Sequence, residues 1–107
     1  MEINQFQILL VNLDPTIGSE IKKPRPCVVI SPDEMNKYLR TVVIAPMTTS
    51  SKKYPTRIAL KHDDNKSWVV LDQIRTIDKQ RIIKVLGSLT KSEISELKSI
   101  VRETYVD

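Results

Sequence analysis

The chain is poor in the residues on which several common kinds of protein chemistry depend. Its 107 residues include one cysteine, one histidine and two glycines. A single thiol cannot form an intramolecular disulfide, and one His with one Cys does not make a zinc site. The sequence also contains no glycine-rich phosphate loop and no Ser, His and Asp set with the spacing of a hydrolase triad. We therefore expect a function that uses neither a metal ion nor a cofactor.

Long hydrophobic runs are also missing. Apolar residues make up 40% of the chain, but no run approaches the roughly 20 residues that cross a bilayer. The first residues lack the basic and hydrophobic regions of a secretory signal. We expect a cytoplasmic protein with no membrane partner and, at this length, a single domain over residues 1–107. The lone Cys27 precedes Val28 and Val29, which predicts a buried thiol rather than a nucleophile.

Charge is present in excess of one sign. The formal net charge is +4 and the isoelectric point is near 9.3. Residues 1–89 carry 14 Lys and Arg against 9 Asp and Glu, whereas residues 90–107 carry 3 against 4. Such an excess is often only solvated surface, but it also suits a polyanionic partner such as RNA or DNA.

Short apolar runs separated by turn residues predict a mainly β fold. Six strands are expected, over residues 8–13, 26–31, 41–46, 57–60, 67–72 and 81–86. The second is nearly continuous in apolar residues, which indicates burial on both faces, and it is expected to pair with the third. Residues 33–39 suit a short helix, residues 47–55 a polar loop, and Thr90 with Glu93 a capping box that begins a C-terminal amphipathic helix. We predict a small, strongly bent sheet or barrel with peripheral helices.

Polar side chains at the ends of these runs are the candidates for chemistry. They are Glu20, Arg25, Thr48, Asp72 and Gln73. Without metal or imidazole, such a set suits phosphate chemistry in which the substrate supplies the nucleophile, as the RNA 2'-hydroxyl does. An arginine fits because its fixed fork of donors matches phosphate oxygens.

Each of these residues also has an ordinary structural interpretation. Arg25 could belong to a solvated basic turn, and Thr48 could be a turn former. Asp72 could form a cross-strand ion pair with Arg75. His62 lies beside Asp and Asn residues in what reads as an exposed turn.

Several separated motifs, in the same order, make the chain resemble the MazF/PemK family of bacterial toxin endoribonucleases from end to end. The motifs are Asn12-Leu13-Asp14-Pro15, Gly18-Ser19-Glu20, Arg25-Pro26, Ser31-Pro32, Ala45-Pro46-Met47-Thr48, Tyr54-Pro55 and the run from Asp72-Gln73 to Arg81. The resemblance implies an SH3-like barrel shared with the CcdB toxins, and a homodimer. It also implies a cognate MazE-like antitoxin whose disordered C-terminal tail occupies the RNA groove, and DNA binding by the complex of the two.

The resemblance also implies roles for single residues. Arg25 matches the catalytic arginine of the family and Thr48 its catalytic threonine. The RNA-binding positions are expected at Ser19, Glu20, Lys23, Thr49, Ser50, Asp72 and Gln73. The chain departs from the family pattern in four places. Leu9 stands where members usually carry an aromatic residue in the first strand. Gln5-Phe6-Gln7 stands where members usually have a basic residue, Gly and an acidic residue, and Ser19 and Val70 stand where the Kid-type branch has His and Arg.

The function that follows is the toxin of a type II toxin-antitoxin system. It would cleave single-stranded RNA within a short sequence motif, without metal, to a 2',3'-cyclic phosphate and a 5'-hydroxyl. The general base stays open between Glu20 and the substrate with water, because arginine is a poor base. A CcdB-like toxin that binds gyrase without cleaving RNA is one alternative, and a catalytically silent RNA-binding module or antitoxin sponge is another.

Overall fold

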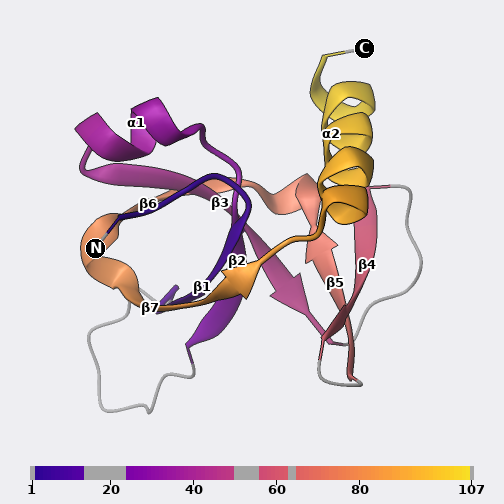
Figure 1. Ribbon diagram of the computed structural model, residues 1–107, viewed down its shortest axis with the longest axis horizontal. Coiled ribbons are helices and arrows are strands. Elements are labelled where there is room, and N and C mark those ends of the chain that lie inside the picture. The colour runs from indigo at the N-terminus through magenta and orange to yellow at the C-terminus, as the bar shows by residue number, and fades with distance from the viewer. Residues whose placement is uncertain (1, 14–23, 50–55, 63–64, 107) are drawn as a thin grey trace.

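The computed structural model describes residues 2–13, 24–49, 56–62 and 65–106 (Figure 1). Within them the strands are β1 (Gln7–Val11), β2 (Arg25–Val29), β3 (Thr41–Thr48), β4 (Arg57–His62), β5 (Asn65–Val70), β6 (Arg75–Asp78) and β7 (Ile82–Ser88). The helices are α1 (Asp33–Tyr38) and α2 (Lys91–Tyr105), and two 3-10 turns are η1 (Leu71–Gln73) and η2 (Lys79–Arg81).

The strands form one antiparallel sheet that bends around its central strand. The order is β4-β5-β3-β2-β1-β7, and β6 pairs with β3 off this path. Strand β3 pairs with β6 at its start, with β2 in its middle and with β5 at its end. The predicted mainly β architecture with a C-terminal helix is confirmed, and so is the pairing of the second and third predicted strands. In the described part of the chain the path is open between β4 and β7, so hydrogen bonds do not close a barrel.

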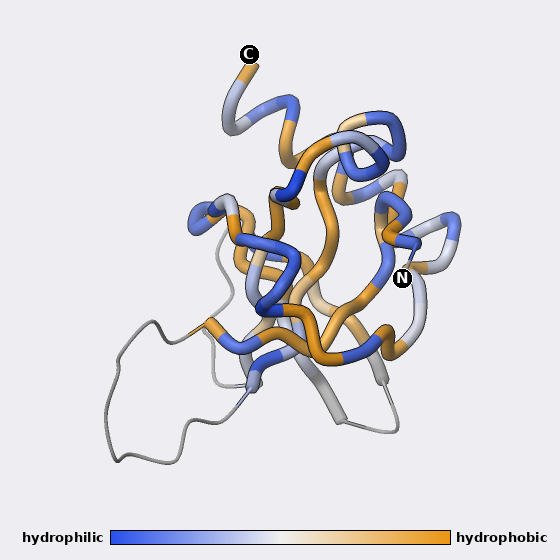
Figure 2. Tube along the Cα trace, turned by 90° about the vertical axis from the view of Figure 1, so that its left-hand side faces the viewer, coloured by the Kyte–Doolittle hydropathy of each residue, from blue (hydrophilic) through white to orange (hydrophobic). Residues whose placement is uncertain are grey.

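Both faces of the central strands are buried. Cys27, Val28 and Val29 are 0% exposed, as the uninterrupted apolar run predicts. Val28 belongs to a core cluster that Leu97 of α2 joins, whereas Cys27 and Val29 belong to a second cluster that contains Ile77 of β6. Figure 2 shows the result, with hydrophobic stretches gathered in the middle of the molecule and hydrophilic ones at its periphery. The strand ends are therefore held by a core on either side.

Helix α2 begins at the predicted capping box. The Glu93 backbone N–H donates to Thr90 Oγ1 (3.3 Å), and the Thr90 N–H donates to Glu93 Oε1 (2.8 Å). The helix packs against β4 and η1, as Figure 1 shows, and buries Leu97 to 2% exposure. No helix in the described ranges is both long and apolar enough to cross a membrane.

The turn before β1 explains one departure from the family pattern. Phe6 has a φ of 69°, in the left-handed region that favours glycine. The turn is fixed by hydrogen bonds from Phe6 N to Val29 O (2.8 Å) and from Gln5 Nε2 to Ile30 O (2.8 Å). The Phe6 ring packs against the first core cluster, with Lys98 Nζ 5.7 Å from its centroid. These contacts offset the strain of a left-handed backbone at a residue with a Cβ.

Several predicted strand boundaries are wrong, and one strand was missed. Met47 and Thr48, placed in a polar loop, are the last residues of β3, because β5 gives them hydrogen-bonding partners. The expected strand over residues 67–72 ends at Val70, and Asp72 lies in η1 instead. Strand β6 was not predicted as a separate strand. His62 ends β4.

Candidate active site

A pocket at one end of the sheet contains both predicted catalytic residues. Its volume is about 330 Å³, and its lining residues are Arg25, Pro26, Met47, Thr48, Thr49 and Ser67. They come from the first two residues of β2, from the end of β3 with the residue that follows it, and from the middle of β5. The pocket therefore brings together three segments that lie far apart in the sequence.

Strand register explains why Arg25 and Thr48 meet. Cys27 of β2 stands opposite Pro46 of β3, and the same antiparallel register carried two residues further places Arg25 opposite Thr48. Directly opposed residues share a face of the sheet and have neighbouring Cβ atoms. Thr48 in turn stands opposite Trp68 of β5. The pairing of β2 with β3 therefore brings Arg25 and Thr48 to the same end of the sheet, where Arg25 pairs with β1 and Thr48 with β5.

The guanidinium of Arg25 is available to a ligand. Arg25 opposes Val11 of β1 and is followed by Pro26, which favours an extended backbone at the preceding residue. The side chain is exposed, and the only ion pair among the described residues joins two others, Arg57 and Asp72. Thr48 beside it is half-buried and Thr49 exposed. A positive charge and two hydroxyl groups at the mouth of one pocket are suited to hold a phosphate.

Cys27 lies next to this pocket but is not equipped as a nucleophile. The thiol is fully buried, and its burial raises the pKa of Cys27 to about 12, against the opposing effect of the Arg75 and Arg25 charges. Its Sγ contacts the Arg25 carbonyl oxygen at 3.7 Å. A neutral thiol at physiological pH packs as a small apolar side chain. The predicted structural role of Cys27 is confirmed.

Ser67 is a pocket residue that the sequence did not point to. It is 8% exposed, and its Oγ has no hydrogen-bond partner within the described chain. On β5 it alternates with Trp68 and shares a face with the buried Val69. The signal that could have identified it is its spacing: Ser67 is two residues before Val69 and so shares its buried face, where an apolar side chain is the rule.

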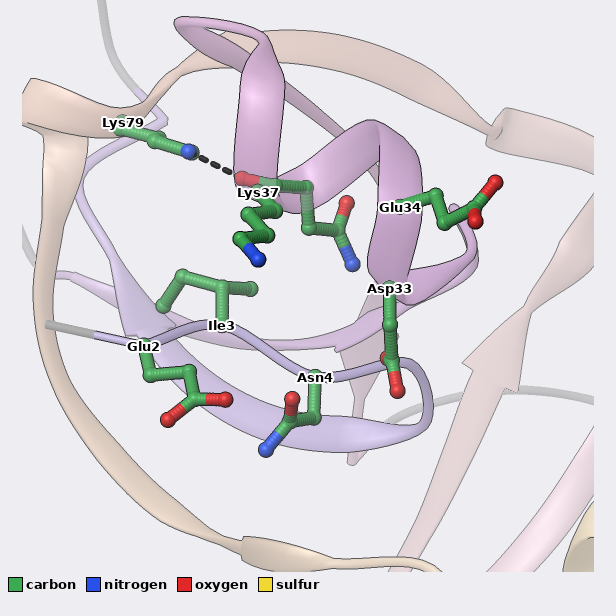
Figure 3. A pocket seen from close by; sticks show the side chains of 8 residues that line it. Glu2, Ile3, Asn4, Asp33, Glu34, Lys37 and Lys79 are labelled. Carbon is green, nitrogen blue, oxygen red and sulfur yellow. Dashed lines mark hydrogen bonds between the residues drawn. The ribbon is translucent and has the colours of Figure 1, made fainter.

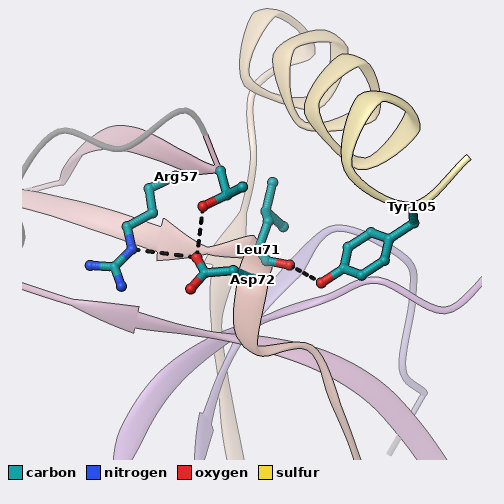
Figure 4. A network of polar contacts seen from close by, with 5 residues as sticks. Arg57, Leu71, Asp72 and Tyr105 are labelled. Atoms are coloured by element: carbon teal, nitrogen blue, oxygen red, sulfur yellow. Dashed lines mark hydrogen bonds and ion pairs between the residues drawn. The ribbon is translucent and has the colours of Figure 1, made fainter. Parts of the chain in front are cut away.

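Asp72 and Gln73 lie in η1 and do not line this pocket. Figure 4 shows Asp72 held from β4: Arg57 Nε lies 3.4 Å from Asp72 Oδ1, and Thr56 Oγ1 donates to the same oxygen at 3.0 Å. Burial tends to raise the pKa of Asp72, but the hydrogen bonds from Thr56 and Arg57 and the charge of Arg57 outweigh it and hold that pKa below its ordinary value. The proposed ion pair with Arg75 is wrong.

The C-terminal helix also holds the η1 turn. The Tyr105 hydroxyl donates to the Leu71 carbonyl oxygen at 2.5 Å (Figure 4), and the Leu71 N–H donates to Thr56 O at 3.1 Å. Leu71 itself is fully buried. Asp72 and Gln73 are therefore presented on an exposed but fixed turn.

A larger cavity of about 480 Å³ lies at the opposite end of the sheet, beside α1 (Figure 3). There Lys79 Nζ donates to the Asn36 carbonyl oxygen, and Asp33 Oδ1 accepts from the Gln5 N–H at 2.6 Å. Acidic and basic side chains are mixed in its lining, and no predicted site residue lies in it. Lys79 and Asp33 in this lining already hold neighbouring segments of the fold together.

Four predicted RNA-binding residues, Ser19, Glu20, Lys23 and Ser50, lie outside the described residues. Among the described residues, no group of three or more His, Cys, Asp or Glu side chains could hold a metal ion. The fold and pocket together define a small antiparallel β protein whose site is built from an arginine and hydroxyl side chains.

Comparisons with known proteins identify the family of this chain. The sequence pattern of a family described as PemK-like, MazF-like toxin of type II toxin-antitoxin system matches residues 4–105. The Endoribonuclease MazF of Staphylococcus epidermidis is 36% identical over 101 residues, which cover 89% of this chain and 84% of that protein. The chain belongs to the PemK-like, MazF-like family of type II toxins.

Solved structures share the fold. A MazE-MazF complex (Form-II) from Deinococcus radiodurans superimposes with a TM-score of 0.82 at 21% identity, covering 96% of this chain and 95% of that one. An endoribonuclease in complex with its cognate antitoxin from a mycobacterial species gives a TM-score of 0.80 at 20% identity, covering 94% and 92%. The predicted fold family is confirmed.

Proposed function

We propose that this toxin is an endoribonuclease that cleaves single-stranded RNA within a short sequence motif, without a metal ion. The observation that carries the proposal is the meeting of Arg25 and Thr48 in one pocket at the end of the sheet. A relative 36% identical bears the name of an endoribonuclease, which supports the same activity. The basic body of the chain suits a polyanionic substrate.

The chemistry follows from what the pocket offers. The ribose 2'-hydroxyl attacks the adjacent phosphorus, and the bond from phosphorus to the 5'-oxygen breaks. The products are a 2',3'-cyclic phosphate and a 5'-hydroxyl, once the departing oxygen has taken a proton. Negative charge develops on the phosphate oxygens, and the Arg25 guanidinium stabilises it through paired N–H donors. Thr48 holds the phosphate in line with a hydrogen bond.

Proton transfer needs a group besides Arg25. A guanidinium stays protonated at neutral pH and is a poor base. The neutral, buried Cys27 thiol does not serve either. Glu20, or the substrate with a water molecule, is left for this role, as the sequence indicates.

Specificity is assigned to polar groups around the pocket. Thr49 lines it, and Asp72 with Gln73 lies on the fixed η1 turn. Ser19, Glu20, Lys23 and Ser50 complete the proposed RNA-binding set. Such groups read single-stranded bases by hydrogen bonds to their edges.

We also propose a homodimer, a cytoplasmic location and a MazE-like antitoxin with a disordered tail. Strand β7 ends the sheet path and exposes Ile83, Val85 and Leu86, which supports a protein partner on that edge. Structures described as MazE-MazF complexes share the fold, which supports the antitoxin. Light scattering of the purified chain should give twice the mass of 12.3 kDa.

The direct test is to incubate the purified protein with a long transcript in EDTA. Discrete fragments are expected, with cyclic phosphate ends by mass spectrometry. Intact RNA would contradict the proposal, and inhibition of gyrase by the same preparation would then favour a CcdB-like function.

A further inference from the structure

Ser67 stands apart from the polar residues that hold the fold together. More than nine-tenths of its surface is buried, and its Oγ has no hydrogen-bond partner among the described residues. It lines the pocket that contains Arg25 and Thr48. A buried hydroxyl without a partner lowers the stability of the folded state, because the group has lost its hydrogen bonds to water.

Ser31 is a second buried serine, and its hydroxyl is fully hydrogen-bonded within the protein. Its Oγ donates to Asn36 Oδ1 at 2.5 Å and accepts from the Val43 N–H at 3.0 Å. Asn36 Nδ2 donates in turn to the Ser31 carbonyl oxygen at 2.8 Å. Every polar atom of the Ser31 side chain is thus engaged. The hydroxyl of Ser67 is left without any such partner.

The described residues around Ser67 offer its hydroxyl no hydrogen bond. On the β4 side it stands opposite Leu60, which is buried, and the antiparallel register carried one residue past Thr48 and Trp68 brings it opposite Thr49. Met47 and Pro26 supply apolar lining to the same pocket. An alanine would fill this position without an unsatisfied atom. The serine therefore points to a ligand that approaches from the pocket.

We propose that the Ser67 hydroxyl donates a hydrogen bond to the RNA phosphate that binds between Arg25 and Thr48. In the free protein its oxygen is covered, and a step of χ1 between staggered rotamers turns it toward the pocket. A phosphate oxygen beside the Arg25 guanidinium is the acceptor that such a hydroxyl meets there. The free protein is thus less stable than it could be, and the bound phosphate satisfies the hydroxyl.

This inference rests on the proposed RNA function, and its test separates the two. The variants are Ser67→Ala, Ser67→Cys, which replaces the hydroxyl by a slightly larger and weaker donor, and Ser31→Ala as the matched control. Binding is measured by anisotropy of a labelled oligonucleotide that carries deoxyribose at the cleaved position found with the long transcript. Urea unfolding midpoints are measured for each variant, and cleavage is measured on the all-ribose oligonucleotide.

Both Ser67 variants should unfold at or above the wild-type urea concentration, yet bind about tenfold or more weakly. Ser31→Ala should unfold earlier and bind normally at low urea. Wild-type affinity and cleavage in Ser67→Ala would overturn the proposal for Ser67 and leave the nuclease intact. An earlier unfolding midpoint for Ser67→Ala would also overturn it, because the hydroxyl would then have a partner in the free protein.

If the wild-type protein binds RNA but cuts no transcript, the proposed cleavage fails. The probe is then the all-ribose oligonucleotide that the wild-type protein binds most tightly. Comparing the affinities of the wild type and Ser67→Ala for this probe still tests the role of Ser67. A wild-type protein that binds no RNA overturns both.

Discussion

The two ends of the sheet treat buried polar groups in opposite ways. At the α1 end, Ser31 and Asn36 satisfy each other and the backbone of β3. At the other end, Ser67 Oγ is unpartnered, and so is Asn12 Oδ1, which follows the strand residue opposite Arg25. Buried polar atoms in folded proteins are nearly always hydrogen-bonded. Among the described residues both exceptions lie at the end of the sheet with Arg25, which supports the binding proposed there.

Cavity size does not make the same distinction. The larger cavity lies at the α1 end, where Ser31 and Asn36 are hydrogen-bonded, and the smaller one contains Arg25 and Thr48. At the larger cavity, Lys79 and Asp33 are engaged with backbone groups. The state of the polar groups therefore identifies the site better than its volume does.

The largest expected effect on RNA cleavage comes from removing the charge of Arg25. Arg25→Ala should fold normally and lose cleavage by several orders of magnitude, because loss of a preorganised charge at a transition state costs about 3 to 4 kcal/mol or more. Single-turnover cleavage measures the loss. Arg40→Ala is the matched control, since Arg40 is exposed and lies near α1 at the other end. Equal losses in the two variants would remove the distinction between the ends.

Thr48 should give the next largest effect. Thr48→Val keeps a β-branched residue in β3 and removes the hydroxyl, so cleavage should fall about a hundredfold while the fold is retained. Thr48→Ser keeps the hydroxyl and should recover most of the rate. Circular dichroism checks the fold. If Thr48→Val unfolds, Thr48 holds the strand and not the phosphate.

At the α1 end, substitution of Ser31 should reduce the stability of the fold and leave RNA cleavage unchanged. Ser31→Ala leaves Asn36 Oδ1 and the Val43 N–H without their partner, which should cost about 1 to 3 kcal/mol in the free energy of unfolding. Urea denaturation measures it. Cleavage per folded molecule should equal that of the wild type, and a specific loss of rate would show that the two ends are coupled.

The smallest effect concerns Asp72, whose pKa is lowered in the folded protein. Its contribution to stability is present above the ordinary pKa of 3.8 and is lost as the pH falls through the folded value. Arg57→Gln should move the pKa of Asp72 upward, whereas Arg75→Gln should leave it in place, because the ion pair joins Asp72 to Arg57. Carboxyl NMR titration distinguishes the two. An upward shift in the Arg75 variant alone would contradict the pairing.

The sequence predicts the parts of this fold that local chemistry determines. Thr90 and Glu93 have the spacing of a capping box, and the apolar run through Val28 identifies a strand buried on both faces. Arg25 before Pro26 begins a strand, as its backbone preference indicates. The catalytic roles proposed for Arg25 and Thr48 rest on the family resemblance, and the pairing of β2 with β3 brings the two residues to the same end of the sheet.

What the sequence could not give depends on partners far away in the chain. Met47 and Thr48 have no alternating pattern, and they are strand residues only because β5 pairs with them. The pairing of Asp72 with Arg57 requires the η1 turn, which periodicity does not reveal. Phe6 adopts a left-handed backbone because hydrogen bonds to Val29, Ile30 and Asp33 hold the turn before β1. The spacing of Ser67 from Val69 indicates an inward position, but that Ser67 lines the pocket with Arg25 is known only from the structure.

The central claim is that the end of the sheet with Arg25 and Thr48 cleaves RNA with the substrate's own 2'-hydroxyl as nucleophile. The most direct measurement replaces the one ribose at the cleaved position by deoxyribose in a short oligonucleotide, with EDTA present and product ends analysed by mass spectrometry. Cleavage should be abolished and binding largely kept, since the phosphate and base contacts survive. Cleavage of the deoxy-substituted strand, or a product without a cyclic phosphate, would contradict the account.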